Sequence, residues 1–426
     1  MGNASSTNTH RWLHCEDVLR LILAEIPRPD LNSASLISRD FAVVARGLIL
    51  QRFVLDISDE NKCKRRLDTL RSSPHISERV TELAIVGELT RKRWYHHLKE
   101  LDDSSSTELE RVESLEELQC IIQGGIFKAG LQKVRWDAGL DIPATLINAI
   151  QVGFPECRFT LEKYAGSVLP AMPNLISLAA TVRFPGDPLL NFQPILLHSP
   201  RLHSLRIAAY NRSGCVVRVV TLEDTEDEVH TKPFLTYDPT KPVCEMEIGP
   251  RIEELVLEGF TWSDAGAVKS LESISWSRLR KLELTRCNAI PLLRTWVLVG
   301  TSLPSLAEFK FVVWLESHDE QTRASATTQA LQNFLSSASG LQALHIEGPH
   351  HPLVSTIATH HGAILRSLVL HDHERADEPQ RATLTTRDLR RLGESCISLH
   401  HLGVDVNADY TVTQDADSKV THYGLR

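Results

Sequence analysis

A six-residue pattern of apolar residues recurs along most of this 426-residue chain and restricts its fold more than any other feature. Each copy reads apolar-x-x-apolar-x-apolar, and the alternation at its end is typical of a strand with one buried face. Copies begin at Val80, Leu131, Leu202, Ile252, Leu279, Leu306, Leu341, Leu365 and Leu399, with a weaker copy at Leu175. Three neighbouring pairs begin 27 residues apart and one pair 24 residues apart, which indicates an array of stacked repeats.

Helix-like stretches lie between the copies. Residues 108–122, 324–335 and 386–396 carry apolar side chains on one helical face. A strand followed by a helix at a regular period predicts an α/β fold, a curved solenoid with a parallel sheet on its concave side. A degenerate copy is expected near Phe159. Cys287 occupies the ninth position of its repeat, where a cysteine satisfies backbone groups as the chain leaves the strand.

The N-terminal part of the chain has a different periodicity. Its first apolar residues recur on one face of a helix, which Pro27 and Pro29 end. A second short helix is expected from Asp30, and Ser38 precedes a third that runs from Arg39 to Leu50.

These changes of pattern predict the domain organisation. We expect a polar tail at 1–11, a helical domain at 12–55, a connecting segment at 56–75, a repeat solenoid at 76–404 and a C-terminal tail at 405–426. The repeats are interrupted at 208–250, where an acidic run around Glu226 precedes three prolines. This interruption is interpreted as a solvated loop, with a flap that contacts a partner as the alternative.

Composition and motifs exclude several functional classes. The 46 Lys and Arg residues against 54 Asp and Glu give a net charge of −8, without the basic surplus of a dedicated nucleic-acid binder. No apolar run is long enough for a membrane span, and the eight scattered cysteines are typical of reduced thiols in the cytosol or nucleus. Nucleotide-binding, serine-hydrolase and zinc-protease motifs are missing, and the grouped histidines lack metal-ligand spacing. No catalytic residue, metal or cofactor is therefore expected.

The helical segment resembles an F-box. The residues that match that motif in register are Asp17, Val18, Leu19, Ile22, Leu23, Ile26, Pro27, Asp30, Leu31, Leu36, Ile37, Ser38, Arg39 and Phe41. His14 and Cys15 replace the Leu-Pro pair with which the motif begins. The array resembles leucine-rich repeats, whose period is about 20–29 residues. The whole chain is similar to divergent, fungal-type F-box proteins with C-terminal leucine-rich repeats.

This resemblance implies a non-enzymatic substrate receptor of an SCF-type cullin-RING ubiquitin ligase. The F-box would dock on the adaptor subunit, and through it on the cullin scaffold, while the repeats hold a target protein for ubiquitin-dependent degradation. The adaptor-binding residues would be Val18, Leu19, Ile22, Leu23, Ile26, Pro27, Leu31 and Ile37.

The outward positions of the concave strands are where a solenoid of this kind binds its partner. Their charges change along the array, which would select a target by charge pattern. The expected target-binding residues are Arg135, Arg206, Glu254, Lys281, Glu283, Glu308 and Lys310.

Two further interpretations of the chain stay open. One is a leucine-rich-repeat scaffold that has no ligase partner, and the other is an enzyme or small-ligand receptor formed by the interruptions. Separately, the first residues fit the N-myristoylation pattern at Gly2, and a single acyl chain would add weak membrane association to a cytoplasmic or nuclear location.

Overall fold

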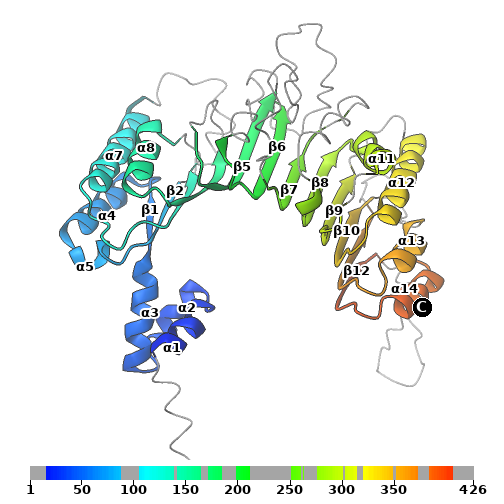
Figure 1. Ribbon diagram of the computed structural model, residues 1–426, viewed down its shortest axis with the longest axis horizontal. Helices are drawn as coiled ribbons and strands as arrows, with labels where there is room; N and C mark the ends of the chain where they lie inside the picture. Colours follow the sequence, from blue (N-terminus) through cyan, green and yellow to red (C-terminus); the bar gives the residue numbers. More distant parts are fainter. Residues whose placement is uncertain are drawn as a thin grey trace, which may run out of the picture. The chain divides into compact units, whose positions relative to one another are not determined.

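The computed structural model describes residues 16–87, 105–138, 142–164, 171–184, 198–211, 251–260, 262, 276–300, 303–313, 320–348, 352–372 and 383–405. In these residues, strands alternate with helices, and twelve strands follow one another in the sheet in the order of the chain (Figure 1). The predicted α/β class and the parallel sheet are confirmed. The chain divides into two compact units, residues 1–180 and 181–426, which are described in turn.

Unit 1 begins with three short helices, α1 (Glu16–Ala24), α2 (Arg28–Ala34) and α3 (Arg39–Gln51), here called the three-helix segment. Pro29 lies in the first turn of α2, where a missing backbone N–H costs no helical hydrogen bond. The Ser38 hydroxyl accepts a hydrogen bond from the Phe41 backbone N–H at 3.2 Å and so caps α3. The small core of the segment consists of Leu19, Leu23, Leu31, Ala34, Val44 and Ala45.

The sheet of unit 1 begins earlier than the sequence predicted. Its strands are β1 (Arg52–Asp56), β2 (Glu82–Gly87), β3 (Lys133–Ala138), β4 (Arg158–Tyr164) and β5 (Leu175–Phe184), which continues past residue 180. Strand β1 directly follows α3 and pairs in parallel with β2. Residues 52–55 therefore belong to the sheet and not to the helical domain.

Helices cover the sheet of unit 1, and the first of them lies in the segment that was expected to be a connector. They are α4 (Glu60–Ser72), α5 (Pro74–Ser77), α7 (Ser105–Gln123) and α8 (Ala144–Gly153). Helix α4 lies inside the segment 56–75 and buries Cys63, Leu67 and Leu70. The Asp59 side chain caps this helix by accepting a hydrogen bond from the Lys62 backbone N–H at 3.0 Å. The expected connecting segment thus contains a helix that packs into the core of unit 1.

Unit 2 contains the more regular strands. They are β6 (Ser204–Asn211), β7 (Glu254–Glu258), β8 (Lys281–Cys287), β9 (Glu308–Val313), β10 (Ala343–Glu347), β11 (Ser367–His371) and β12 (His401–Val404). The helical elements between them are η3 (Trp276–Arg278), α11 (Ile290–Val299), α12 (Glu320–Ser337), α13 (Leu353–His360) and α14 (Thr386–Ser395). Buried aromatic rings fill the space between helix and sheet, and Trp296 and Phe334 pack with ring centroids 5.6 Å apart.

The repeated apolar pattern produces the register of this sheet. Leu255, Leu282 and Phe309 lie opposite one another on adjacent strands and are all buried. Before each strand one carbonyl accepts two backbone hydrogen bonds from the next repeat, as Arg280 does from Ala307 and Glu308. In every predicted copy the last two apolar positions lie on a strand, and the degenerate copy at Phe159 lies on β4.

Cys287 has the backbone role expected from its place in the repeat. Its Sγ lies 3.4 Å from the Leu257 carbonyl oxygen and 3.3 Å from that of Thr285. Burial raises the pKa of this thiol to about 12, so the group acts as a neutral, structural hydrogen-bond donor.

Among the described residues, no helix combines the length and the apolar character that a membrane crossing requires.

Candidate functional site

The outward face of the strands in unit 2 gathers the residues expected to bind a target. Glu254, Lys281 and Glu308 occupy adjacent register positions near the starts of β7, β8 and β9. A second row, two residues further along the strands, contains Arg206, Glu283 and Lys310 on β6, β8 and β9. The alternating burial of each strand directs these side chains away from the core.

Ion pairs neutralise part of this face. Lys310 Nζ lies 3.1 Å from Glu283 Oε1, and the Ser204 hydroxyl donates a hydrogen bond to Glu254 at 3.1 Å. Lys281 and Glu308 form no ion pair with another described residue. In unit 2, the outward strand face therefore presents both positive and negative charges to a partner protein.

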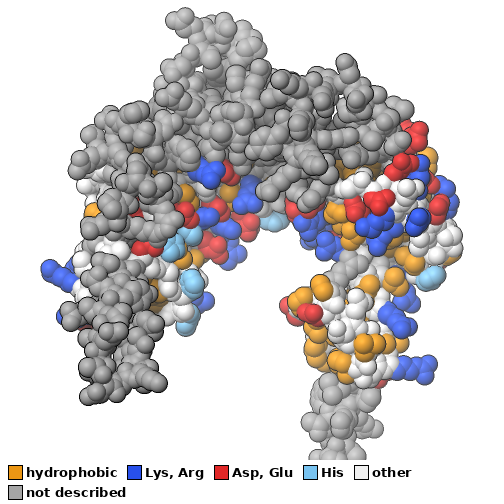
Figure 2. All heavy atoms as spheres, turned by 180° about the vertical axis from the view of Figure 1, so that it is seen from behind, with side chains coloured by type: hydrophobic (Ala, Val, Ile, Leu, Met, Phe, Trp, Pro, Cys, Tyr) orange, Lys and Arg blue, Asp and Glu red, His pale blue; other side chains and the backbone are white. Residues whose placement is uncertain are grey.

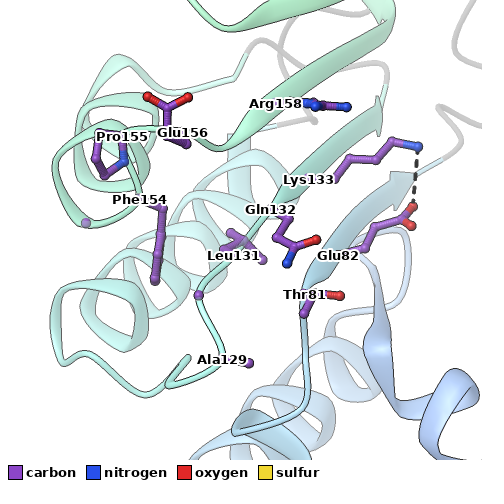
Figure 3. A pocket seen from close by; sticks show the side chains of 12 residues that line it. Thr81, Glu82, Ala129, Leu131, Gln132, Lys133, Phe154, Pro155, Glu156 and Arg158 are labelled. Atoms are coloured by element: carbon purple, nitrogen blue, oxygen red, sulfur yellow. Dashed lines mark ion pairs between the residues drawn. The ribbon is translucent and has the colours of Figure 1, made fainter. Parts of the chain in front are cut away.

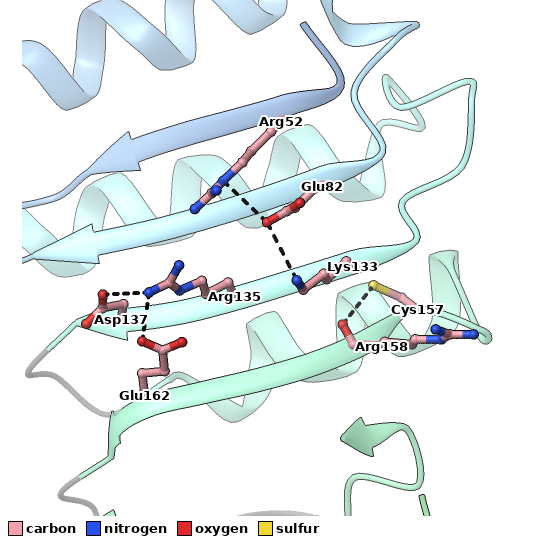
Figure 4. A network of polar contacts seen from close by, with 8 residues as sticks. All are labelled: Arg52, Glu82, Lys133, Arg135, Asp137, Cys157, Arg158 and Glu162. Carbon is pink, nitrogen blue, oxygen red and sulfur yellow. Dashed lines mark hydrogen bonds and ion pairs between the residues drawn. The ribbon is translucent and has the colours of Figure 1, made fainter. Parts of the chain in front are cut away.

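Arg135, the target-binding residue expected in unit 1, belongs to a separate ionic network (Figure 4). Its guanidinium lies 2.8 Å from Glu162 on β4 and 3.4 Å from Asp137 on its own strand. Both of its anionic partners are supplied within unit 1. Arg135 is thus held in place by its neighbours, in contrast to Lys281.

The residues expected to bind the adaptor separate into two groups. Leu19, Leu23 and Leu31 are buried in the core of the three-helix segment and are not exposed to a partner. Val18 and Ile26 are partly buried, whereas Pro27 is exposed. Helical periodicity identifies an apolar face on the first helix, but the second and third helices of the segment cover most of that face.

Five apolar side chains of the three-helix segment are exposed, and two of them, Ile22 and Ile37, belong to the expected adaptor-binding set. The exposed fraction is 72% for Leu21, 47% for Ile22, 86% for Leu36, 68% for Ile37 and 56% for Val43. We call these five residues the apolar patch. Figure 2 shows hydrophobic side chains gathered on the surface of this segment. Leu21, Leu36 and Val43 were missed as site residues, although Leu36 lies within the quoted motif.

Several of the described histidines lie near the end of unit 2. His345 Nε2 lies 2.8 Å from Glu347, and His371 Nδ1 lies 3.1 Å from Asp405. Burial lowers the pKa of His345, although Glu347 opposes the shift. Within the part of the chain that the structure describes, no group of three or more His, Cys, Asp or Glu residues could hold a metal ion.

A pocket of about 620 Å³ lies at the N-terminal ends of three strands of unit 1 (Figure 3). Thr81 and Glu82 line it from β2 and its approach, Gln132 and Lys133 from β3, and Arg158 from β4. Leu131, Phe154 and Pro155 supply apolar lining from the loops that precede the strands. Its lining includes no histidine, cysteine or serine. Sequence reasoning did not identify this pocket.

The expected tail at 1–11 and, apart from residue 405, the expected tail at 405–426 lie outside the described residues. Two further expectations lie outside them as well. They are the myristoylation pattern at Gly2 and the acidic part of the interruption, from residue 212 to residue 250.

No protein-family model matches this chain, and no curated protein sequence matches it.

Proposed function

We propose that this protein is the substrate-recognition subunit of an SCF-type cullin-RING ubiquitin ligase. Its three-helix segment would dock on the adaptor subunit, which links it to the cullin, and the outward strand face would hold a target protein. No residue of this chain would make or break a bond. Catalysis would arise from proximity, because a bound target is carried close to the activated ubiquitin of a partner enzyme. The site of action would be the cytosol or the nucleus.

The observation that carries the adaptor-docking half is the apolar patch. Full burial of one large aliphatic side chain contributes about 1.5–3 kcal/mol, so five such residues on a segment of three short helices favour a partner that covers them. The segment is small, and its own core has six fully buried residues. Small helical units of this size commonly gain stability from a partner or from an adjoining domain.

The target-binding half is supported by the chemistry of the strand face. Its outward positions combine charges of both signs with small residues such as Ala343 and Ser367. A rigid sheet that presents a fixed charge pattern favours selection of a complementary protein surface.

Substitution of two patch residues tests the proposal in cells. We expect Leu36→Asp combined with Ile37→Asp to abolish co-purification of the adaptor and the cullin, because binding would bury two unpaired carboxylates at a cost of several kcal/mol. Both side chains are exposed in the free chain, so the fold is expected to survive. The measurement is quantitative mass spectrometry of proteins recovered with the tagged full-length chain.

Leu298→Asp is the matched control, because Leu298 is 84% exposed and lies on α11 in unit 2. This variant should recover adaptor and cullin as wild type does. Leu23→Asp is unsuitable, since Leu23 is buried and the substitution would unfold the segment. If the double variant still recovers the adaptor at the wild-type level, the patch is not the docking surface. If the wild-type chain recovers neither subunit, the protein is a repeat scaffold without a ligase.

A further inference from the structure

In unit 1, the outward side chains at the starts of the first four strands carry more positive than negative charge. Arg52, Glu82, Lys133 and Arg158 follow one another in register on β1, β2, β3 and β4. Three cations therefore share a single carboxylate in this row. Figure 4 shows Glu82 between Arg52 and Lys133, with Arg158 on the strand beyond.

The carboxylate of Glu82 lies closer to one cation than to the other. Glu82 Oε1 is 3.3 Å from Arg52 Nε and 4.0 Å from Lys133 Nζ. Arg158 is exposed and forms no ion pair with any residue that the structure describes. Lys133 and Arg158 are direct register partners on neighbouring strands, where like charges oppose each other at a cost in stability. An anion that binds both side chains would relieve this repulsion.

The pocket of Figure 3 opens beside these two cations. Lys133 and Arg158 line it, and Leu131, Phe154 and Pro155 give it an apolar part. Its volume of about 620 Å³ falls within the range of about 300–1,000 Å³ that is typical of ligand sites. The second lining carboxylate, that of Glu156, lies across the pocket from Lys133 (Figure 3).

Hydrogen bonds of the sheet fix the backbone at both residues. The Lys133 N–H donates to the Thr81 carbonyl at 3.1 Å, and the Arg158 N–H donates to the Gln132 carbonyl at 2.9 Å. A ligand would therefore meet an ordered strand edge and would not have to order a loop.

We propose that this pocket binds an acidic peptide segment of a partner protein. An apolar side chain of the segment enters the pocket, and the carboxylate of a neighbouring Asp or Glu pairs with the Arg158 guanidinium. The site would be one contact point for the target and in this sense rests on the proposed function. The assay below contains no adaptor, so a failure of adaptor docking would leave its result unchanged.

Selection from a random peptide library tests this site on the full-length chain. Phage that display random 12-residue peptides are selected on the wild-type protein and then counter-screened on Arg158→Glu. We expect peptides that depend on Arg158 to carry Asp or Glu beside a large apolar residue. The proposal is overturned if no peptide is enriched, if none of the enriched peptides depends on Arg158, or if those that do lack an acidic residue.

Synthetic copies of a selected peptide then test each half of the contact by fluorescence polarisation. Arg158→Glu or Lys133→Glu should weaken binding at least about tenfold, equivalent to about 1.4 kcal/mol, and a Glu-to-Lys exchange in the peptide should restore binding to Arg158→Glu. Replacement of the apolar peptide residue by serine should also weaken binding. Arg65→Glu on α4, an equal change of charge at an exposed helical position, should leave the affinity unchanged.

Two results of these titrations would contradict the assignment. Equal peptide affinity of wild type and Arg158→Glu would show that these cations do not bind the peptide. Binding by a phosphoserine peptide but not by its glutamate counterpart would assign the pair to phosphate and not to a carboxylate. Matching thermal melts of all variants would exclude loss of fold as the cause.

Discussion

His361 illustrates how a single buried side chain couples the stability of this fold to pH. The ring is completely buried in unit 2, directly after α13, and its Nε2 lies 2.8 Å from the Leu335 carbonyl at the end of α12. Nδ1 has no hydrogen-bond partner in the structure. Burial lowers the pKa of His361 below its ordinary value of 6.5, against the opposing effect of the Leu335 hydrogen bond. The folded state therefore favours a neutral imidazole that donates from Nε2.

The direction of this shift predicts a loss of stability in mild acid. As the pH falls below about 6.5, the unfolded chain takes up a proton that folded His361 does not, so the free energy of unfolding decreases until the folded pKa is reached. Above that range the contribution of the neutral ring is complete. Urea unfolding of wild type and His361→Gln at pH 8 and pH 5.5 measures the effect. The glutamine variant, which keeps a donor for Leu335, should lose less stability on acidification.

An equal pH dependence in the two proteins would show that other groups cause the loss. The comparison is needed because the chain contains 19 histidines in total.

At the scale of single elements, the turn after β10 depends on a glycine. Gly348 has a φ of +136°, and a Cβ at this position would lie 2.7 Å from Cγ2 of Val313 on β9. Its N–H donates to the His371 carbonyl at 2.7 Å. The turn thus needs a residue without a side chain, because both the backbone angle and the neighbouring strand exclude one.

We expect Gly348→Ala to lower the free energy of unfolding by about 1–3 kcal/mol, from backbone strain together with the contact to Val313. Chemical denaturation monitored by circular dichroism gives the value. Gly153→Ala at the end of α8 is the control, since a Cβ there meets nothing within 4 Å. If both variants had wild-type stability, the close approach to Val313 would be tolerated by small shifts of the strand.

The strands were the part of the fold that the sequence determined best. Their inward positions alternate with outward positions, and a period of two residues survives even where the copy is degenerate, as at Phe159 on β4. The same pattern is present at Leu50, Phe53 and Leu55, but it overlaps the end of α3, where helical periodicity masks it. Strand β1 was therefore assigned to the helical domain.

The exposed apolar patch was predictable only in part. The sequence shows that Leu19, Ile22 and Leu23 share one side of α1, but not which of them the next helices cover. Leu19 and Leu23 are buried by residues of other helices. The apolar periodicity within one helix does not show which residues of the other helices will contact it. The pocket beside Lys133 was not predictable for the same reason, because three separate strands and two loops form it.

At the scale of the whole molecule, the proposal separates two functions onto two parts of the chain. Adaptor docking is assigned to the three-helix segment and target binding to the strand faces. Substitutions in one surface should therefore leave the other unchanged, since sites without shared partners contribute nearly independently.

Lys281→Glu combined with Glu308→Lys tests this separation. The two residues are register partners on β8 and β9, and exchange of their charges should weaken target capture while the net charge and adaptor binding remain unchanged. Substitutions at these outward positions are expected to cost the fold less than about 0.5 kcal/mol, because neither side chain is buried. Quantitative proteomics of the ligase-bound partners measures the effect. An unchanged set of partners would locate the target-binding surface elsewhere.

The most direct test of the central proposal is titration of the purified full-length chain with a purified SCF adaptor subunit by isothermal calorimetry. We expect saturable binding with one adaptor per chain and at least an about hundredfold loss of affinity, equivalent to about 2.7 kcal/mol, for Leu36→Asp combined with Ile37→Asp. Leu298→Asp should bind as wild type does. Absence of binding by the folded wild-type chain, or equal binding by the double variant, would contradict the account.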